Sequence, residues 1–374
     1  MMRKKLSGFT MILVLLILGI GCGSAAVSPA ALTVPPLQTE VLADGLDHPW
    51  GLAMLPDGSL LFTERYGRLS RLTADGIFEV ATIPNVRARG EGGLLGLAVD
   101  PDFETNGLIY VAYNVEQDIP EVRVTRYELT ADFELAAATH IVEGIPAAAG
   151  GRHSGTQLAM GEDGVLWIGT GDAAAAENPQ DPESLAGKIL RVDRNGEPAE
   201  GNLESPFDPR IFSFGHRNTQ GLILFPEADD GVYGYSAEHG SYRDDEINGL
   251  LPGNFGWAPD PPYDERVPMT DLERFPDAVE AAWSSGESTI AVSGLTMLSG
   301  AAWGELDGVL AVGVLKDRHV RLIRIEDGEV TGEAKLVAGE FGRIRAVYAA
   351  PDGALYFSTD NGSDDRILRV VPAE

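Results

Sequence analysis

The chain has 374 residues, of which 44% are hydrophobic, so it can bury a large core in one big domain or in two ordinary ones. Its formal net charge of −29 argues against nucleic-acid binding, which needs clustered basic residues, and is compatible with an acidic solvated surface, bound cations or a saline habitat. The 45 glycines and 23 prolines are many for a helical protein and favour a β fold rich in turns.

The first 22 residues have the pattern of an export signal. Three basic residues, Arg3, Lys4 and Lys5, precede an apolar run over residues 9–20, which is as long as a signal-peptide core and short for a membrane span. We therefore expect residues 1–22 to be a signal peptide and the folded part to be exported to the periplasm or the cell surface. Residues 23–38 are rich in alanine and proline and are expected to form a tether.

The only cysteine, Cys22, closes this segment, so no intrachain disulfide can form. Residues 18–22 resemble a bacterial lipobox in which Cys22 carries the lipid, although Gly19 stands where the pattern prefers leucine. The alternative is a plain secretory signal that is cleaved near Ala25 or Ala26. On the first interpretation the protein has a lipid anchor in the membrane.

One pattern recurs through the rest of the chain. An apolar strand leads into a turn of Pro, Asp and Gly residues, and a second apolar strand ends on polar residues. The copies cover residues 51–64, 96–114, 157–172, 221–238, 294–316 and 346–360. Repeats of this length with short strands predict an all-β fold, a six-bladed β-propeller with four-stranded antiparallel blades over residues 39–374. Residues 39–43 are an extra strand that can complete the last blade, and the alternative fold is two β-sandwiches.

Polar residues flank each repeat on the side away from its turn. In a propeller the first strand of each blade starts at one face and the second returns to it, so these residues should surround the central axis at one face. Those before the first strands include His48, Glu91, Arg152, His153, Arg217, Asn218, Ser293, Arg343 and Arg345. Those after the second strands include Glu64, Asn114, Asp172, Glu238, His239, Lys316, Asp317 and Asp360. The longest insertion, residues 239–292, starts from this face.

The third copy carries the clearest candidate for chemistry. A glycine-flanked His153 opens its first strand, and Asp172 ends its second strand. If the two strands form a hairpin, the two side chains meet at one edge, where the carboxylate can support the histidine as a general base. A lone histidine with a structural role is the simpler alternative.

Four cations of the ring, Arg217, Lys316, Arg343 and Arg345, stand out because the chain is so acidic. They would repel one another unless an anion lay between them, so they fit a ligand with several carboxylates or phosphates. The alternative is that they pair with ring acids such as Asp317 or Asp360. A tight run of carbonyls and carboxylates over residues 238–248 suits a hard cation such as Ca²⁺, with a solvated acidic loop as the alternative.

Several motifs occur in an order that is specific when they are taken together. They are Pro49-Trp-Gly-Leu, Thr63-Glu-Arg, Glu91-Gly-Gly-Leu-Leu-Gly, Arg152-His-Ser-Gly, Gly187-Lys-Ile-Leu-Arg, Phe214-Gly-His-Arg-Asn, Glu238-His-Gly, Asp245-Glu-Ile-Asn, Asn254-Phe-Gly-Trp, Leu315-Lys-Asp and Arg343-Ile-Arg. With them the chain, from about His48 to its end, resembles the soluble glucose/sorbosone dehydrogenase family that depends on pyrroloquinoline quinone (PQQ). The resemblance is greatest to the bacterial aldose sugar dehydrogenases, which use PQQ and Ca²⁺.

The resemblance implies a six-bladed propeller and a role for each matching residue. His153 would take the proton of the anomeric hydroxyl while the C1 hydride passes to PQQ, and Asp172 would orient the imidazole. Arg217 would stabilise developing negative charge at the quinone. The implied cofactor-binding residues are Arg217, Asn218, Lys316, Arg343 and Arg345, and the implied Ca²⁺ ligands are the carbonyls of Gly240 and Ser241. We expect substrate contacts from Glu64 and Arg152.

Two positions depart from the family pattern. Ser241 stands where the family usually has proline, and Arg152 stands where the glucose-oxidising members have an acid that contacts sugar, so their substrate preference does not transfer. A second, structural Ca²⁺ near Tyr263 and Asp264 is a further hypothesis.

The leading hypothesis is therefore an exported quinoprotein that oxidises aldose sugars at C1 to lactones. Its electron acceptor is unidentified, a quinone, a cytochrome or, in vitro, a dye. The first alternative is a propeller on the cell surface that binds a ligand without catalysis. The second is a metal-dependent sugar lactonase that uses carboxylates such as Glu64, Glu91 and Glu238.

Overall fold

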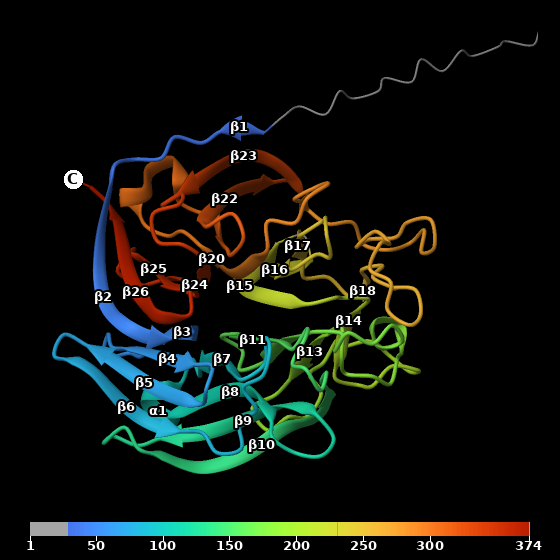
Figure 1. Cartoon of the computed structure of the whole chain (residues 1–374), viewed down its shortest axis with the longest axis horizontal. Coiled ribbons are helices and arrows are strands. Elements are labelled where there is room, and N and C mark those ends of the chain that lie inside the picture. Colours follow the sequence, from blue (N-terminus) through green and yellow to red (C-terminus); the bar gives the residue numbers. More distant parts are fainter. Residues whose placement is uncertain (1–28, 230, 374) are drawn as a thin grey trace, which may run out of the picture.

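Six antiparallel sheets follow one another along the chain and form a closed ring in the computed structural model, which describes residues 29–229 and 231–373 (Figure 1). Each sheet has four antiparallel strands as its blade, and in the last blade one of the four comes from the N-terminal part of the chain. The predicted six-bladed propeller is therefore confirmed. The expected signal peptide with Cys22 lies outside the described residues. Among the described residues, no helix combines the length and apolarity that a membrane span requires.

The first three blades come from the first half of the ring. Blade 1 contains β3 (Pro49–Met54), β4 (Leu60–Glu64), β5 (Arg68–Thr73) and β6 (Gly76–Thr82). Blade 2 contains β7 (Leu94–Val99), β8 (Leu108–Val115), β9 (Glu121–Leu129) and β10 (Leu135–Pro146). Blade 3 contains β11 (Gly155–Met160), β12 (Leu166–Thr170), β13 (Lys188–Val192) and β14 (Ile211–Phe214), with β18 (Gly253–Asn254) added in parallel to β14.

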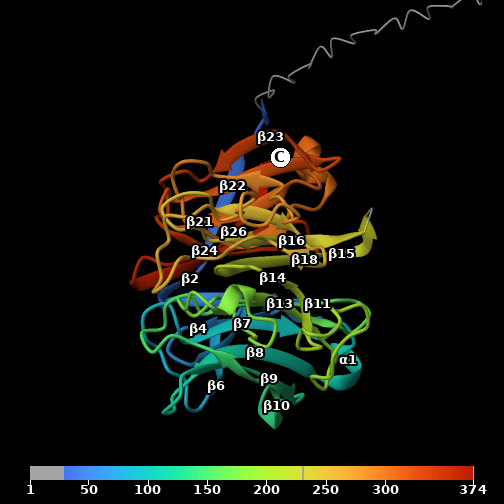
Figure 2. The ribbon, with the colours of Figure 1, turned by 90° about the vertical axis from the view of Figure 1, so that its right-hand side faces the viewer.

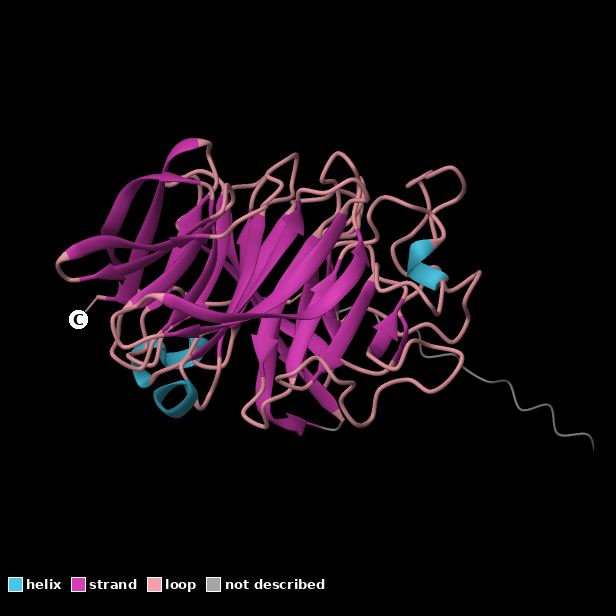
Figure 3. Ribbon diagram, turned by 90° about the horizontal axis from the view of Figure 1, so that it is seen from below, coloured by secondary structure: helices cyan, strands magenta, loops and turns pink. Residues whose placement is uncertain are grey.

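The other three blades complete the ring. Blade 4 contains β15 (Thr219–Asp229), β16 (Val232–Glu238), β17 (Glu246–Gly249) and β19 (Trp283–Ser284). Blade 5 contains β20 (Val292–Met297), β21 (Leu310–Val314), β22 (His319–Glu326) and β23 (Glu329–Leu336). Blade 6 contains β24 (Ile344–Ala349), β25 (Leu355–Thr359), β26 (Ser363–Pro372) and β2 (Leu37–Asp47). The described residues contain three short helices, α1 (Phe103–Asn106), η1 (Asn178–Gln180) and η2 (Ala301–Leu306), which lie between strands (Figure 3).

The two ends of the described chain close the ring together. Strand β2, near the N-terminus, pairs antiparallel with β26, the last strand, so the predicted extra strand over residues 39–43 is present and extends further in both directions (Figure 1). Part of the expected tether also contacts the propeller, since β1 (Ala30–Ala31) pairs in parallel with β23 and Leu32 is buried against blade 5. The folded part therefore begins before residue 39.

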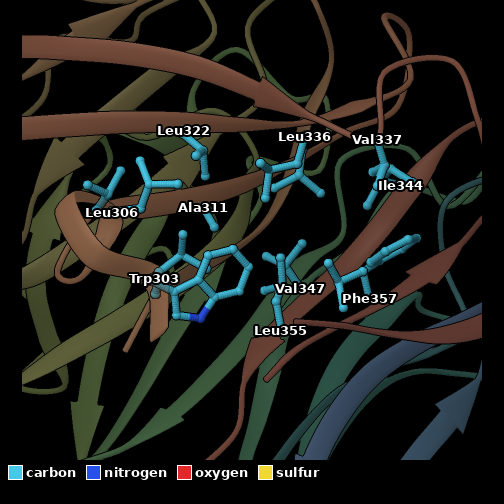
Figure 4. Packing of buried hydrophobic residues seen from close by; sticks show 14 of the residues in the cluster. Trp303, Leu306, Ala311, Leu322, Leu336, Val337, Ile344, Val347, Leu355 and Phe357 are labelled. Atoms are coloured by element: carbon cyan, nitrogen blue, oxygen red, sulfur yellow. The ribbon is translucent and has the colours of Figure 1, made fainter. Parts of the chain in front are cut away.

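The repeat begins with Gly-Leu in four blades because the first strands approach one another closely around the axis. A Cβ atom on Gly51 would lie 2.8 Å from the carbonyl oxygen of Leu95 in the next blade, and one on Gly96 would lie 2.1 Å from that of Thr156. The same holds for Gly221 and Gly294. Packing between neighbouring blades forms the core, as Trp303, Leu322 and Phe357 do between blades 5 and 6 (Figure 4).

The strand register brings the polar ends of each repeat to one face. Pro49 pairs with Glu64, Gly155 with Thr170, and Thr219 with Glu238, so the residues just beyond these pairs surround the axis together. The side view shows the strands crossing between the two faces (Figure 2). A cavity of about 710 Å³ is lined by first-strand residues of several blades, and Trp50 and Arg345 are among its lining residues.

Candidate active site

His153 is held at the polar face by a tight Gly-Arg-His-Ser-Gly segment. Its backbone is in the left-handed region at φ 53°, which costs a non-glycine residue roughly 1–2 kcal/mol and is a feature often found at functional sites. Gly151 allows this turn because a Cβ there would lie 1.7 Å from the carbonyl oxygen of Arg89. The predicted pairing is confirmed, since Nδ1 of His153 lies 2.9 Å from Oδ1 of Asp172.

The Asp172 carboxylate is completely buried and accepts hydrogen bonds from four groups. Besides His153, its donors are the backbone N–H of Ala174 at 2.7 Å, the indole of Trp257 at 2.8 Å and the hydroxyl of Tyr263. Burial raises the pKa of Asp172, but the hydrogen bond and charge of His153, with Arg217 and Tyr263, outweigh it and hold the pKa below its ordinary value. The carboxylate therefore stays ionised and fixes the ring nitrogen that faces it.

Sequence reasoning missed Trp257 and Tyr263 as parts of this pair. Both lie in the insertion between β17 and β19, where the sequence offered only the motif Asn254-Phe-Gly-Trp and the hypothesis of a second Ca²⁺ near Tyr263. In the described part of the chain, no group hydrogen bonds to Nε2 of His153, while Nδ1 is occupied by Asp172. The free nitrogen is therefore the one available to a substrate proton.

A buried lysine fixes the loop that follows Asp172. The Nζ atom of Lys188 donates to the carbonyls of Asn178, Pro179 and Ala186 at 2.6, 3.1 and 2.9 Å. The amide of Asn178 in turn donates to the carbonyl of Asp172 at 2.9 Å. Burial lowers the pKa of Lys188 to about 7, against the opposing charges of Asp181 and Asp172. The geometry of this loop thus depends on a lysine buried beneath the site.

Arg217 lies directly beside Asp172, because the backbone N–H of Asp172 donates to the carbonyl of Arg217 at 2.8 Å. Its side chain is 3% exposed and donates to the carbonyl of His239 at 2.6 Å and to Glu265 at 2.5 Å. Its Nε is buried and has no partner among the described residues. This N–H group has no acceptor in the described part of the chain, so it is available to an acceptor on a bound ligand.

A chain of hydrogen bonds crosses the axis from His153 to the other side of the ring. The backbone N–H of His153 and the amide of Asn218 both donate to Glu91, at 3.0 and 3.3 Å. The amide of Gln220 donates to Asn218 at 3.1 Å and accepts from Arg345 at 2.9 Å. The structure thus brings together His153, Asp172, Arg217, Asn218 and Arg345, with Glu91 and Gln220 as the links between them.

Arg345 pairs with Asp360, so the alternative that the ring cations pair with a ring acid is correct for Arg345, while Arg343 only lies near the same carboxylate. Arg345 donates to Asp360 at 2.7 Å and stacks on Trp50 with 3.7 Å from Cζ to the ring centre. Arg343 is 42% exposed, and its Nη2 lies 3.7 Å from the same carboxylate, beyond hydrogen-bond range. Burial raises the pKa of Asp360, but Arg345 and His48 outweigh it and hold the pKa well below its ordinary value.

Lys316 follows β21 in the neighbouring blade 5 and has a different environment. Its Nζ donates to the carbonyl of Thr289 at 2.6 Å and to the hydroxyl of Ser288 at 3.3 Å, and the side chain is exposed. No acid in the described part of the chain pairs with it. Lys316 and the two free amino groups of Arg343 therefore remain available to an anion.

The loop that follows β16 holds carbonyl groups close together. A Cβ on Gly240 would lie 2.1 Å from the carbonyl oxygen of Arg243, so only glycine fits there. The carboxylate of Asp245 is fully buried and accepts from Gly240, Thr289, Ile290 and Ala291, which leaves it no free oxygen. The expectation that carboxylates of this loop bind the cation is therefore not supported for Asp245, while the carbonyl of Ser241 accepts no hydrogen bond from the described residues.

Glu64 is not free to contact a substrate. It is 2% exposed, and its oxygens accept from the guanidinium of Arg68 and the backbone N–H of Asp47. Among residues 29–229 and 231–373, the single group of three metal-ligating side chains within 4.8 Å is His48, Asp360 and Asp365. Glu64, Glu91 and Glu238 do not form such a group, so the geometry does not favour the lactonase hypothesis. The Asp360 and Asp365 oxygens are themselves occupied by protein donors.

Arg152 lies at the mouth of the site. Its side chain is 46% exposed and pairs with Glu265 at 2.5 Å, the same carboxylate that pairs with the buried Arg217. Glu265 comes from the insertion and was not predicted. The site therefore has an acid at its mouth, but it is Glu265 from the insertion that pairs with Arg152.

Known proteins resemble this chain over nearly all of its length. The sequence pattern of the family described as “Glucose / Sorbosone dehydrogenase” matches residues 46–369. The aldose sugar dehydrogenase YliI of Escherichia coli (strain K12) is 31% identical over 369 aligned residues, which cover 94% of this chain and 96% of that protein.

Two solved structures have the same fold. The soluble aldose sugar dehydrogenase of Escherichia coli in its apo-form is similar with a TM-score of 0.81 and 30% identity, over 90% of this chain and 100% of that chain. The PQQ-bound form of the aldose sugar dehydrogenase of Streptomyces coelicolor is similar with a TM-score of 0.74 and 30% identity, over 90% of this chain and 99% of that chain.

The buried acid Glu246 yields a prediction on stability. Burial and the neighbouring Glu238 raise the pKa of Glu246 to about 8, so between its unfolded value and pH 8 the folded state holds a proton that the unfolded state has lost. Stability from this group is therefore lost as the pH rises from about 5 to 8. We predict that Glu246→Gln raises the melting temperature by about 5 °C relative to the wild type at pH 8 and much less at pH 5.

Thermal unfolding at both pH values measures this difference. Glu273→Gln, which removes an exposed acid from the insertion that follows β17, is the control and should show no such dependence. An equal effect of Glu246→Gln at both pH values would contradict the prediction.

Proposed function

Because this chain belongs to the glucose/sorbosone dehydrogenase family, we propose that it is an oxidoreductase that oxidises aldose sugars at C1 to lactones with PQQ and Ca²⁺. The observation that carries the proposal is the buried His153–Asp172 pair, whose free Nε2 adjoins a ring of cations at one face. The aldose sugar dehydrogenases similar to this chain support the substrate class, and the PQQ-bound structure from Streptomyces coelicolor supports the cofactor.

The cations of the ring fit a quinone that carries several carboxylates. The amino groups of Arg343 and the ammonium of Lys316 make no ion pair within 3.5 Å in the described part of the chain, and the buried Nε of Arg217 has no acceptor there. Charged donors of this kind bind carboxylates strongly, and a buried donor without an acceptor is rare. Arg217, Asn218, Lys316, Arg343 and Arg345 would hold PQQ.

The carbonyl oxygens of Gly240 and Ser241 would hold the Ca²⁺ ion. Ca²⁺ prefers oxygen ligands, and the tight loop that Asp245 fixes presents backbone oxygens rather than side-chain carboxylates. Because the ligand atoms belong to the backbone, serine in place of the usual proline at position 241 does not remove a ligand. When bound, PQQ and Ca²⁺ would supply the two-electron acceptor and a Lewis acid.

The protein's own part in the reaction is proton transfer and charge stabilisation. Nε2 of His153 accepts the proton of the anomeric hydroxyl, and Asp172 keeps the proton of Nδ1 in place and stabilises the imidazolium that forms. Arg217 offers its Nε–H to negative charge that develops beside the base. Arg152, with its partner Glu265, contacts the sugar at the mouth of the site.

The proposal also includes a location and an electron acceptor. Residues 1–22 would direct export, with the folded part in the periplasm or at the cell surface and Cys22 as a lipid anchor. A quinone, a cytochrome or, in vitro, a dye would accept the electrons.

Reconstitution tests the proposed function directly. We predict that the purified protein reduces a redox dye with aldoses only when both PQQ and Ca²⁺ are added, because neither its side chains nor its backbone can accept a hydride. A panel of aldoses, assayed with each addition omitted in turn, measures this. Tight PQQ binding without turnover on any aldose would favour the non-catalytic binding propeller instead.

Removal of the base separates binding from catalysis. We predict that His153→Ala retains PQQ binding and loses at least about 100-fold in kcat, since a positioned general base contributes on that order. Dye-coupled kinetics and a PQQ titration measure the two properties. His140→Ala, an exposed histidine of blade 2, is the control, and undiminished turnover of His153→Ala would exclude the base role.

Removal of a cation of the ring should weaken PQQ binding, which removal of the base should leave intact. We predict that Arg343→Met weakens PQQ binding by about 10- to 100-fold, because a charge-assisted hydrogen bond is lost. Equilibrium titration of PQQ followed by its absorbance measures the affinity. Arg366→Met, at 44% exposure on the same blade, is the matched control, and equal affinities of the two variants would contradict the assignment.

A further inference from the structure

The insertion between β17 and β19 supplies a hydroxyl that contacts both members of the catalytic pair. The Tyr263 hydroxyl donates to Oδ2 of Asp172, and its oxygen lies 3.0 Å from Nδ1 of His153. Trp257, from the same insertion, donates to the same oxygen of Asp172 but makes no contact with His153 among the described residues. Tyr263 is thus the residue that joins blade 4 to both groups of the blade 3 hairpin.

The two oxygens of Asp172 have different partners. Oδ1 accepts from His153 at 2.9 Å and from the N–H of Ala174 at 2.7 Å, and Oδ2 accepts from Trp257 at 2.8 Å and from Tyr263. A donor on Oδ2 draws negative charge toward that oxygen and away from the hydrogen bond with His153. The carboxylate is completely buried, so its hydrogen bonds come from protein donors.

The second contact of Tyr263 acts in the opposite direction and is weaker. The hydroxyl oxygen can share the Nδ1–H of His153, which would stabilise the protonated imidazole. A neutral hydroxyl is a poorer acceptor than an ionised carboxylate, so the effect through Asp172 dominates. The net effect of the hydroxyl is to weaken the hold of Asp172 on a protonated His153.

The segment that carries Tyr263 is fixed at its other end. Two residues on, Glu265 pairs with Arg152 and Arg217, and the Arg152 guanidinium lies 5.4 Å from the Tyr263 ring. Burial and the charge of Asp172 raise the pKa of Tyr263 well above its ordinary value, so the hydroxyl stays protonated and remains a donor. The charged groups that face the pair from the elements packed around it are Arg217, Lys188, Glu91, Arg152 and Glu265.

We propose that Tyr263 is a positioning residue that tunes the base: its hydroxyl draws charge from Asp172 and so lowers the proton affinity of His153. The inference rests on the proposed function only where it calls His153 the catalytic base. The effect of the hydroxyl on His153 does not require the cofactor or the substrate. With the hydroxyl present, Nε2 is free to accept the substrate proton at a lower pH. Without it, Asp172 holds the imidazolium more firmly and the base works only at higher pH.

An NMR titration of the His153 ring in protein without cofactor tests this inference. The His153 signal is assigned by its absence from His153→Gln. We expect Tyr263→Phe to raise the titration midpoint of His153 by up to about one pH unit, since the lost hydrogen bond to a charged group is worth about that much and its change between the two states of the ring moves the midpoint. Fluorotyrosine at position 263 keeps the shape and is a stronger donor, so it should lower the midpoint.

The matched control is Tyr110→Phe. Tyr110 is also buried and donates to a buried carboxylate, Asp100, at 2.9 Å, but it lies in blade 2, far along the chain from the pair. This variant should leave the His153 midpoint unchanged. In the PQQ-loaded enzyme, the acid limb of the kcat/KM profile should move upward for Tyr263→Phe and stay in place for Tyr110→Phe.

The outcomes separate this inference from the proposed function. A His153 midpoint that stays in place or falls in Tyr263→Phe, or that does not fall with fluorotyrosine, overturns the role of Tyr263 whatever the enzyme oxidises. If Tyr263→Phe does not fold, the fluorotyrosine protein decides alone. Failure of every aldose to react would overturn the proposed function, while the midpoints would still decide the role of Tyr263.

Discussion

Buried carboxylates that need partners organise the polar face of this propeller. Asp172 has no contact with water, and an unpaired buried charge is too costly to persist, so it collects donors from its own hairpin and from the insertion of blade 4. In the same way, Asp360 binds His48 and Arg345, and Asp245 accepts a hydrogen bond from the backbone of Gly240 and so fixes its loop. Asp172 and Asp360 follow the second strands of their blades and act as internal counter-ions, whereas Asp245 precedes the third strand of blade 4 and fixes backbone groups.

The repeat predicted the architecture because each blade needs the same local features. The leading glycines, the Pro-Asp-Gly turns and the apolar strands are short-range signals, and the close approach of the first strands explains why glycine recurs at positions 51, 96, 221 and 294. The His153–Asp172 pair was predictable for the same reason, since one hairpin register decides whether the two side chains meet.

The remainder of the site depends on contacts between blades, which no local pattern encodes. Trp257, Tyr263 and Glu265 lie in an insertion without regular strands, so their positions depend on packing against blade 3. The error over Glu64 has a different, local origin. Its place after a second strand predicted a ligand contact, but Arg68, four residues on, occupies its carboxylate. The place of a residue in the repeat predicts the face of the propeller on which it lies. Whether its side chain is free to bind a ligand depends on the groups that it contacts in the folded protein.

The electrostatics of the protein as a whole oppose those of the site. A chain with a net charge of −29 repels an anionic cofactor at long range, but salt screens this repulsion beyond about 8–10 Å. Affinity for an anion must therefore come from short contacts with Arg217, Lys316 and Arg343. Arg217 pairs with Glu265 and the Arg343 guanidinium lies near Asp360, while Lys316 has no acidic partner in the described part of the chain. The acidic surface and the cationic site are compatible because they act over different distances.

The central claim is that this face oxidises a sugar at C1, and a single-turnover experiment tests it most directly. Protein loaded with PQQ and Ca²⁺ is mixed rapidly with an aldose, without any external acceptor, and the absorbance of the bound cofactor is followed. The account predicts that one equivalent of sugar reduces one equivalent of cofactor, and that deuterium at C1 slows this step. A bound cofactor whose spectrum does not change with any aldose would contradict it.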